Sequence, residues 1–418
     1  MQELKSLTHW SWFMLDDEYF LEVKRRVYSA LDDSIMQKGV QRGMASFLSN
    51  LTENLGHEHV LQLAGEVKEF KRHSISNMAE LLKQAVDSIQ RNGVAAYIAK
   101  DKDDAKSIIK KLTDDDRIIV KSKSMVAEEI GLRNYLISLG KEVWETDLGE
   151  FIIQLRGDKP AQMVAPSLHV PREEVARLLS DFFKVDFGKD DLKGMVDAVR
   201  NFLREKIAKA DTGITGANAI SAREGALLTV ENEGNIRLTM TLPKKHIVLS
   251  SIEKIVPTTT DALKVCLAQS YYAGYTKPTY ISLTSTPSGT GDIEKVMVRP
   301  AQGSREMHVV LLDNGRSLAS SSEFSDMLRC IKCGACQMVC PSYAVMGPSW
   351  GGKVYTAAIG LVWTAITESI DEAESLSYFC LSCDACNEVC PVGIDVSGLI
   401  KTLRKKGSSN LMNAEGLG

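Results

Sequence analysis

The sequence lacks a long apolar run and any large excess of charge of one sign. Its longest weakly polar stretch, residues 355–366, has twelve residues, well short of the roughly 20 needed to cross a bilayer. The first twenty residues lack the basic and then apolar layout of a secretory signal, because acidic residues interrupt the apolar groups. The net charge of −4 gives no general electrostatic reason to bind nucleic acid. These absences predict a cytoplasmic protein with no membrane span and no nucleic-acid partner.

Motifs of several enzyme classes are also missing. No Ser/His/Asp or HExxH constellation occurs, and the glycines of DTGITGANAISAREG do not follow the GxGxxG order of a dinucleotide fold. The turn TPSGTGD, residues 286–292, could cradle a phosphate, but it lacks the Lys of a P-loop and is expected to be a solvated loop. His57 and His59 are expected at the surface. His169 and His246, each at a strand end, are expected to be hydrogen-bonded structural residues.

Eight of the nine cysteines fall in two tight groups. In a chain expected to be cytoplasmic, such grouping is typical of metal or cluster ligation and not of disulfides. Each group reads CxxCxxCxxxCP: Cys330, Cys333, Cys336 and Cys340 precede Pro341, and Cys380, Cys383, Cys386 and Cys390 precede Pro391. The ninth cysteine, Cys266, lies in an apolar helical pattern and is expected to be an inert core residue.

The spacing predicts two [4Fe–4S] clusters. Three thiolates on a tight turn can bind three irons of one cubane, while the fourth cysteine, followed by proline, binds the other cluster in two-cluster ferredoxins. A pair of zinc sites is the alternative, but zinc favours spaced pairs of ligands over a triplet followed by CP. Two adjacent cubanes would transfer single electrons from one cluster to the other. The first cluster is therefore assigned to Cys330, Cys333, Cys336 and Cys390, and the second to Cys340, Cys380, Cys383 and Cys386.

Local sequence patterns predict how the chain divides into structural segments. Apolar residues at three and four spacing favour a helical N-terminal segment, and short β-rich runs alternating with helical runs are typical of a parallel α/β sheet. Thirty-nine residues, including a helical run, separate Cys340 from Cys380, which favours an α-helical ferredoxin domain. The expected division is a helical segment at 1–70, an α/β domain at 71–313, the α-helical ferredoxin domain at 314–406 and a flexible tail at 407–418.

Several phrases, in conserved order, resemble the iron–sulfur lactate utilisation protein B family. The resemblance covers about residues 121–400 and is more specific than the cysteine motifs alone. The phrases are KSKSMVAEEIGL, ETDLGEFIIQL, GDKPAQMVAPSLHVPREEV, TGITGANAIS, ENEGNIRLTMTLPKKHIVL, MHVVLLDNGRS, LRCIKCGACQMVCP and CNEVCPVGIDV.

The resemblance implies a lactate-utilisation domain with an α/β fold similar to the sugar-isomerase and CoA-transferase type, followed by the helical ferredoxin. It further implies a non-catalytic or co-catalytic subunit of a complex that oxidises L-lactate to pyruvate. The implied partners are a cysteine-rich subunit and a second lactate-utilisation-domain subunit, with electrons passing through the two cubanes to a downstream acceptor. One departure concerns residues 222–226: relatives commonly read AETGS there, whereas this chain reads AREGA and lacks the hydroxyls.

Two other functions stay open from the sequence. The double-cubane module also fits a relay of heterodisulfide-reductase type, serving a flavoprotein that oxidises glycolate or D-lactate. Alternatively, the α/β domain is itself an enzyme acting on a phosphorylated or acyl substrate. A fragment ending near Asp313, without the clusters, would bind or turn over its substrate in that case.

Overall fold

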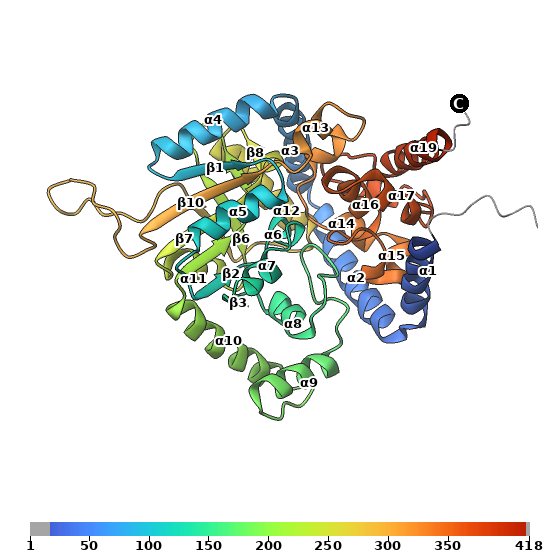
Figure 1. The fold of residues 1–418 in the computed structure, drawn as a ribbon, viewed down its shortest axis with the longest axis horizontal. Coiled ribbons are helices and arrows are strands. Elements are labelled where there is room, and N and C mark those ends of the chain that lie inside the picture. Colours follow the sequence, from blue (N-terminus) through green and yellow to red (C-terminus); the bar gives the residue numbers. More distant parts are fainter. Residues whose placement is uncertain (1–16, 415–418) are drawn as a thin grey trace, which may run out of the picture.

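The structure, a computed structural model, describes residues 17–414 and contains a sheet-based region and a helical region (Figure 1). Among these residues, no helix is long and apolar enough to cross a membrane. The strands are β1 (Ala95–Ala99), β2 (Ile118–Lys121), β3 (Glu142–Glu145), β4 (Thr212–Thr215), β5 (Ala219–Ser221), β6 (Leu227–Glu231), β7 (Lys245–Ser251), β8 (Ile255–Val256), β9 (Tyr280–Thr284) and β10 (Glu306–Leu312).

Helices precede, separate and follow these strands. Those up to the end of the sheet region are α1 (Asp17–Asp32), α2 (Ser34–Leu55), α3 (Glu58–Ser76), α4 (Met78–Arg91), α5 (Lys102–Leu112), α6 (Met125–Glu129), α7 (Leu132–Ser138), α8 (Leu148–Arg156), α9 (Arg172–Phe183), α10 (Leu192–Lys209), α11 (Asn235–Thr241), the 3-10 helix η1 (Ile252–Lys254) and α12 (Thr259–Tyr272). Those that follow are α13 (Arg316–Ser320), η2 (Ser325–Arg329), α14 (Ala335–Met338), α15 (Pro341–Met346), η3 (Gly347–Ser349), α16 (Ala357–Thr367), α17 (Ile370–Ser377), α18 (Ala385–Glu388) and α19 (Val396–Ala414).

A six-stranded sheet in the order β1-β10-β7-β4-β2-β3 forms the centre of the α/β region, and all its pairings are parallel. The expected parallel α/β fold is confirmed. Strand β7 is buried at six of its seven positions, as parallel strands covered on both faces require. Its side chains alternate between two cores: Ile247 and Leu249 pack under α5, α6 and α7, whereas Val248 faces the opposite side.

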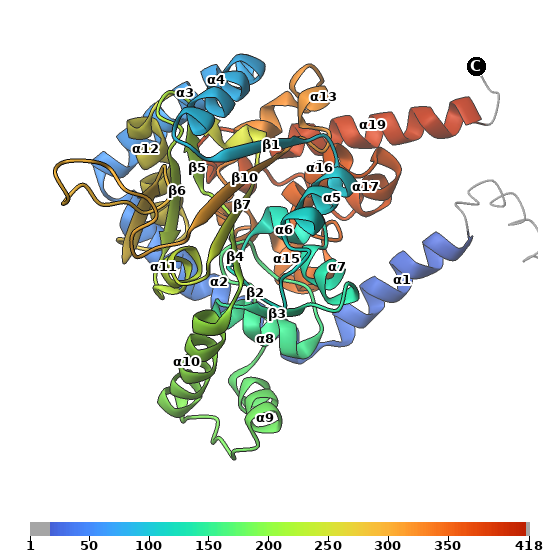
Figure 2. The same cartoon turned by 60° about the vertical axis from the view of Figure 1, so that its left-hand side comes forward.

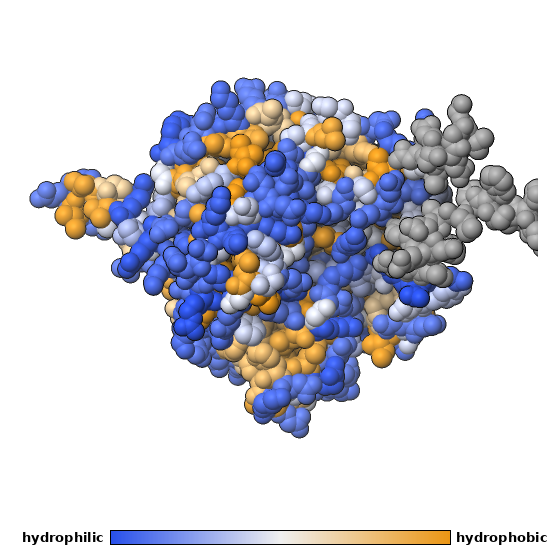
Figure 3. Space-filling view, viewed as in Figure 1, coloured by the Kyte–Doolittle hydropathy of each residue, from blue (hydrophilic) through white to orange (hydrophobic). Residues whose placement is uncertain are grey.

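The second sheet has the order β8-β5-β6-β9, with β6 antiparallel to both neighbours. Between β9 and β10 the chain forms an arm, residues 285–305, that projects from the body (Figures 1 and 2). The TPSGTGD turn lies on this arm. The tip is apolar on its surface (Figure 3), because Ile293, Val296 and Met297 are exposed.

The helical region packs beside the sheet, and the N-terminal helices pack against it. Helices α1 and α2 contact α15, while α3 contacts α12 and η2. The N-terminal segment therefore joins both regions of the molecule (Figure 1). The expected division at residue 70 falls inside α3, whereas the one at 313 falls between β10 and α13.

The C-terminal helix is longer than expected. Residues 407–414, expected to form a flexible tail, belong to α19 in the structure, and residues 415–418 lie outside the described residues. The sequence GSSN reads as a helix breaker by propensity. Once a helix is nucleated and packed at its start, however, each added residue gains a backbone hydrogen bond. Leu399, Ile400 and Leu403 provide that packing, since all three are buried.

Local sequence signals explain where key helices begin. Thr258 and Asp261 form a capping box at the start of α12, in which each side chain accepts a hydrogen bond from the other residue's backbone N–H. In α15, Pro341 occupies the first turn, where its missing N–H costs nothing. The proline after Cys340 therefore turns the chain into a helix directly after the cysteine.

Candidate iron–sulfur centres and the adjoining cleft

The two cysteine loops have the same backbone conformation. Lys332 and Gly334 have φ values of 56° and 80°, and their counterparts Ser382 and Asp384 have 52° and 62°. Each loop then enters a four-residue helix, α14 or α18. A left-handed turn of this kind points successive N–H groups toward its concave side, where they bind anions. The repeated motif thus forms two equivalent cradles for negatively charged sulfur.

Cysteines of both motifs meet in one place. A small, largely apolar cavity is lined by Cys330, Cys333 and Cys336 of the first motif and by Cys390 of the second. Around the second loop, burial together with the neighbouring Cys340, Cys380 and Cys383 sulfurs raises the pKa of Cys386 to about 12. Cys340 therefore lies with the second triplet, while Cys390 lies with the first.

Hydrogen-bond donors surround the sulfurs. The backbone N–H of Lys332 donates to Cys330 Sγ at 3.3 Å, and that of Ile394 donates to Cys390 Sγ at 3.4 Å. The indole Nε1 of Trp350 donates to Cys340 Sγ at 3.4 Å. Four converging sulfurs, N–H donors and apolar walls are the surroundings that [4Fe–4S] clusters need. The residues present therefore fit such clusters.

A buried network of charges lies behind the first loop. The Arg316 guanidinium donates to Glu129 at 2.7 and 2.9 Å and to Glu253 Oε2 at 2.6 Å. Lys332 Nζ, in the first loop, donates to Glu253 Oε1 at 2.9 Å, and the Tyr355 hydroxyl donates to Glu129 at 2.9 Å. Burial opposes ionisation of both carboxylates, but Arg316 outweighs it, so the pKa values of Glu129 and Glu253 lie below their ordinary value. The network joins the carboxyl edge of the sheet to the cysteine loop.

A cleft of about 480 Å³ opens at the same edge of the sheet. Parallel strands bring their carboxyl ends together there, and ligands of α/β proteins commonly bind at such an edge. The cleft lies between these strand ends and Lys332 of the first loop, and its volume falls in the range of small-molecule sites. Its polar walls include Lys123 after β2, Asn218 after β4, Lys254 after β7, Asp147 after β3, Glu233 after β6 and Gln269 of α12.

Deeper at the same edge, Lys121 lies among three glutamates. Its ammonium contacts Glu128 at 3.2 Å and Glu145 at 3.0 Å. Burial, together with the charges of neighbouring carboxylates, raises the pKa of Glu145 to about 7 and that of Glu150 to about 8. Neither carboxylate oxygen of Glu150 has a hydrogen-bond partner among the described residues. Lys121 supplies the cation that this carboxylate group needs.

The other candidate residues lie apart from these centres. His169 Nε2 lies 3.0 Å from Asp158 Oδ2, and His246 Nε2 lies 2.9 Å from Thr215 Oγ1. Both rings are buried and hydrogen-bonded, as expected. His57 and His59 are exposed, and Cys266 is fully buried in α12. None of the five lines the cleft or the cysteine cavity.

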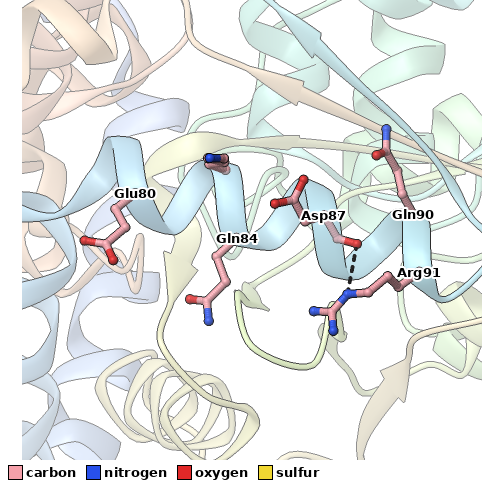
Figure 4. A pocket seen from close by; sticks show the side chains of 6 residues that line it. Glu80, Gln84, Asp87, Gln90 and Arg91 are labelled. Atoms are coloured by element: carbon pink, nitrogen blue, oxygen red, sulfur yellow. Dashed lines mark hydrogen bonds between the residues drawn. The ribbon is translucent and has the colours of Figure 1, made fainter.

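Two further features lie outside the cleft and the cysteine cavity. The 222–226 loop is tied to α4, where Ser88 Oγ donates to Arg223 O at 3.1 Å and Asn92 Nδ2 donates to Glu224 O at 2.9 Å. The exposed face of α4 forms a second, open hollow lined by charged and amide side chains (Figure 4). There, Arg91 Nε donates to the backbone oxygen of Asp87 at 3.3 Å. No cysteine lines this hollow.

Comparison with known proteins matches both regions. Residues 82–312 match the LUD domain, and residues 326–394 match the 4Fe-4S dicluster domain. The chain is 36% identical over 385 residues to Lactate utilization protein B 1 of Bacillus mycoides (strain KBAB4), which covers 90% of this chain and 78% of that protein. The chain belongs to the iron–sulfur lactate utilization protein B family. This family membership confirms the resemblance found in the sequence.

Another relative has an electron-transport name. The family member described here is 36% identical over 392 residues to the Uncharacterized electron transport protein YkgF of Escherichia coli (strain K12), covering 92% of this chain and 80% of that protein. A solved structure of a DUF162 family protein from Deinococcus radiodurans covers 56% of this chain, with 13% identity and a TM-score of 0.32. The family and the dicluster domain identify this lactate utilization protein B relative as an iron–sulfur electron-transfer protein.

The buried network and the cleft were not found from the sequence. Their residues are ordinary Lys, Glu and Asn in phrases that carry no metal or nucleotide motif. One signal was available: KSKS, TGAN and SSIEK each follow a β-rich run of the lactate utilization domain, so polar residues recur where parallel strands end. Lys332 inside CIKC is a second signal, because a lysine between two cluster ligands must be near the cluster.

Proposed function

We propose that this chain is the iron–sulfur electron-transfer subunit of a multi-subunit complex that oxidises L-lactate, or a related 2-hydroxyacid, to the 2-oxoacid. Lactate utilization protein B is the name given to several relatives, which supports the pathway. The equivalent backbones of the two cysteine loops support a pair of [4Fe–4S] clusters in one module. In this proposal residues 314–406 hold the clusters, while residues 71–313 form the lactate-utilisation domain. The expected partners are a cysteine-rich subunit and a second lactate-utilisation-domain subunit.

One observation carries the proposal: a single cavity is lined by Cys330, Cys333, Cys336 and Cys390. It supports a crossed assignment in which the fourth cysteine of each motif serves the other cluster. When bound, each cluster supplies reversible one-electron transfer. The chain's own residues hold the sulfurs in place, donate N–H hydrogen bonds to them and exclude water from the first loop.

Iron and acid-labile sulfide analysis of anaerobically purified protein, with EPR of the reduced state, tests the cluster assignment. We expect about eight irons and eight sulfides per chain, and spin-coupled cubane signals. Cys390→Ala should lose the first cluster, which contains the triplet of the other motif, and Cys340→Ala should lose the second. Cys266→Ala is the matched control, because Cys266 is buried but lies outside both groups. Zinc in place of iron and sulfide would overturn the proposal.

The role in the complex is tested by adding the partner subunits. L-lactate should reduce the clusters of this chain only when the cysteine-rich and second lactate-utilisation-domain subunits are present. D-lactate and glycolate are the comparison substrates. If a flavoprotein partner and D-lactate or glycolate are required instead, the relay of heterodisulfide-reductase type replaces the L-lactate complex.

A further inference from the structure

At one end, next to the first cysteine loop, the cleft is lined by Lys254 and Lys332. Lys254 lines the cleft, and its ammonium donates a hydrogen bond to Ala217 O at 2.7 Å, which leaves two of its three N–H groups for a ligand. Behind it, the cations Arg316, Lys332 and Lys71 are buried.

Among the described residues, the carboxylates of Glu129 and Glu253 pair with Arg316 and Lys332, and the Cys330 sulfur lies near Lys332 and Lys71. Burial and the neighbouring Lys332 charge together lower the pKa of Lys254 to about 7. Lys254 forms no ion pair among the described residues, so an anion in the cleft can pair with its ammonium.

Hydrogen-bonding side chains continue from Lys254 toward the first cysteine loop. Asn218 Nδ2 donates to Gln269 Oε1 at 2.6 Å, and Gln269 Nε2 donates to the backbone oxygen of Lys332 at 3.3 Å. Asn218, Gln269 and Lys332 all line the cleft. This chain of contacts fixes the cleft wall to the loop that carries Cys330 and Cys333.

The other end of the cleft is acidic but contains one cation. Glu233 and Asp147 lie near each other, and burial together with the Asp147 charge raises the pKa of Glu233 to about 7. The Lys123 ammonium lines the same cleft and makes no hydrogen bond to the described residues. These groups can accept a hydrogen bond from a hydroxyl and donate one to a hydroxyl or carbonyl oxygen.

We propose that this cleft binds a small 2-hydroxy or 2-oxo carboxylate, with the carboxylate at Lys254 and the 2-oxygen directed toward the Lys123 and Glu233 wall. The ligand class rests on the proposed function. The location rests on the cleft itself, and it places a ligand site in this chain at the junction of the sheet with the first cysteine loop.

A ligand bound in the cleft should have an electrostatic effect on the first cysteine loop. A small second cavity is lined by Lys254, Asn218 and Lys332, which also line the cleft, and by Cys330 and Lys71. Lys332 therefore lies between the ligand site and the sulfur of Cys330. A carboxylate beside Lys254 changes the electrostatic field at the first loop, whereas the second loop has no residue in either cavity.

Equilibrium binding to the full chain with its clusters, purified anaerobically, tests this site. The probes are L-lactate, pyruvate and acetate, and the variants are Lys254→Met and Lys123→Met. Lys193→Met is the matched control, because Lys193 is 92% exposed on α10. We expect saturable binding of L-lactate or pyruvate, weakened at least about tenfold by Lys254→Met, since a hydrogen bond to a charged group is lost. Lys123→Met should weaken L-lactate more than acetate.

A second readout is the EPR spectrum of the reduced protein, in which L-lactate or pyruvate should perturb one cluster and not the other. Absence of saturation, equal affinity for acetate and L-lactate, or unchanged binding in both cleft variants would overturn the site. Iron content is measured on every sample. If binding fails while the iron and the loss in Cys390→Ala are as expected, the electron-transfer proposal stands and only the site is wrong.

Discussion

The first and second cysteine loops share one backbone conformation but have different surroundings. Cys330, Cys333 and Cys336 are buried at 7–8% exposure, whereas Cys383 is exposed and the neighbouring Leu381 is 67% exposed. The first loop contacts the charge network and the cleft, while an electron carrier can reach the second loop directly from solvent. The motif therefore determines how the sulfurs are held, and the surrounding fold determines what each loop can contact.

The largest effect should come from removing the cation behind the first loop. Arg316→Met leaves Glu129 and Glu253 buried with fewer partners, and we expect a loss of about 3–5 kcal/mol in the free energy of unfolding. Arg177→Met is the control, because Arg177 is 63% exposed beside Asp181 and its pair is worth about 0–1 kcal/mol. Urea unfolding measures both. Equal losses would show that the network does not stabilise the first loop.

Gly334 and Asp384 occupy matching left-handed positions in the two loops, but substitutions at these positions should change the free energy of unfolding by different amounts. A Cβ at Gly334 would lie 2.0 Å from Gln162 Nε2, and Gln162 is fixed by hydrogen bonds to Val164 and Ala165. Gly334→Ala should therefore cost about 1–3 kcal/mol. Asp384→Gly should change the free energy of unfolding by less than about 1 kcal/mol, because two effects oppose each other. Glycine favours the left-handed backbone at this exposed position, whereas the substitution removes the carboxylate that accepts hydrogen bonds from Asn387 and Ser397. A well-tolerated Gly334→Ala would contradict the tight packing of the first loop.

Part of the acid sensitivity of the chain should come from the first loop's network, beside carboxylates elsewhere such as Glu224, whose pKa is also lowered. Arg316 holds the pKa of Glu129 below its ordinary value of 4.5, although burial alone would raise it. A folded-state pKa below the unfolded one gives stability that is present above pH 4.5 and is lost as the pH falls further. Unfolding measured between about pH 5 and pH 3 should lose about 1–2 kcal/mol in the parent chain. Arg316→Met should flatten this dependence, and iron retention followed in parallel separates cluster loss from unfolding.

Exchanging Lys332 and Ser382 should change the reduction potentials of the two clusters in opposite directions, and both positions have the same φ region. Lys332→Ser also removes a buried partner of Glu253, so the free energy of unfolding is measured beside the potentials. Lys332→Ser removes a buried positive charge beside Cys330, so the first cluster should become harder to reduce. Ser382→Lys should raise the potential of the second cluster by less, because solvent and salt screen an exposed charge. Potentiometric EPR titration resolves the two signals. Equal and opposite shifts would show that the two loops are electrostatically alike.

Much of the architecture follows from local pattern. Alternating strands and helices predicted the parallel α/β sheet, which the structure confirms through strands such as β7 and β10. The cysteine spacing predicted a cluster-binding module, which the dicluster domain match confirms. Local propensity did not indicate a helix at residues 407–414, whereas α19 continues through this stretch of a glycine and two serines.

The sequence by itself determined the two cysteine loops, because a tight turn depends on residues a few positions apart. Only the tertiary structure decided the network and the cleft, since Glu129 and Arg316 are 187 residues apart and Lys332 and Glu253 are 79 residues apart. Their side chains have no local periodicity, and they meet because parallel strands end at one edge of the sheet and the helical region packs on that edge. The loops are therefore encoded locally, whereas their different surroundings arise from long-range packing.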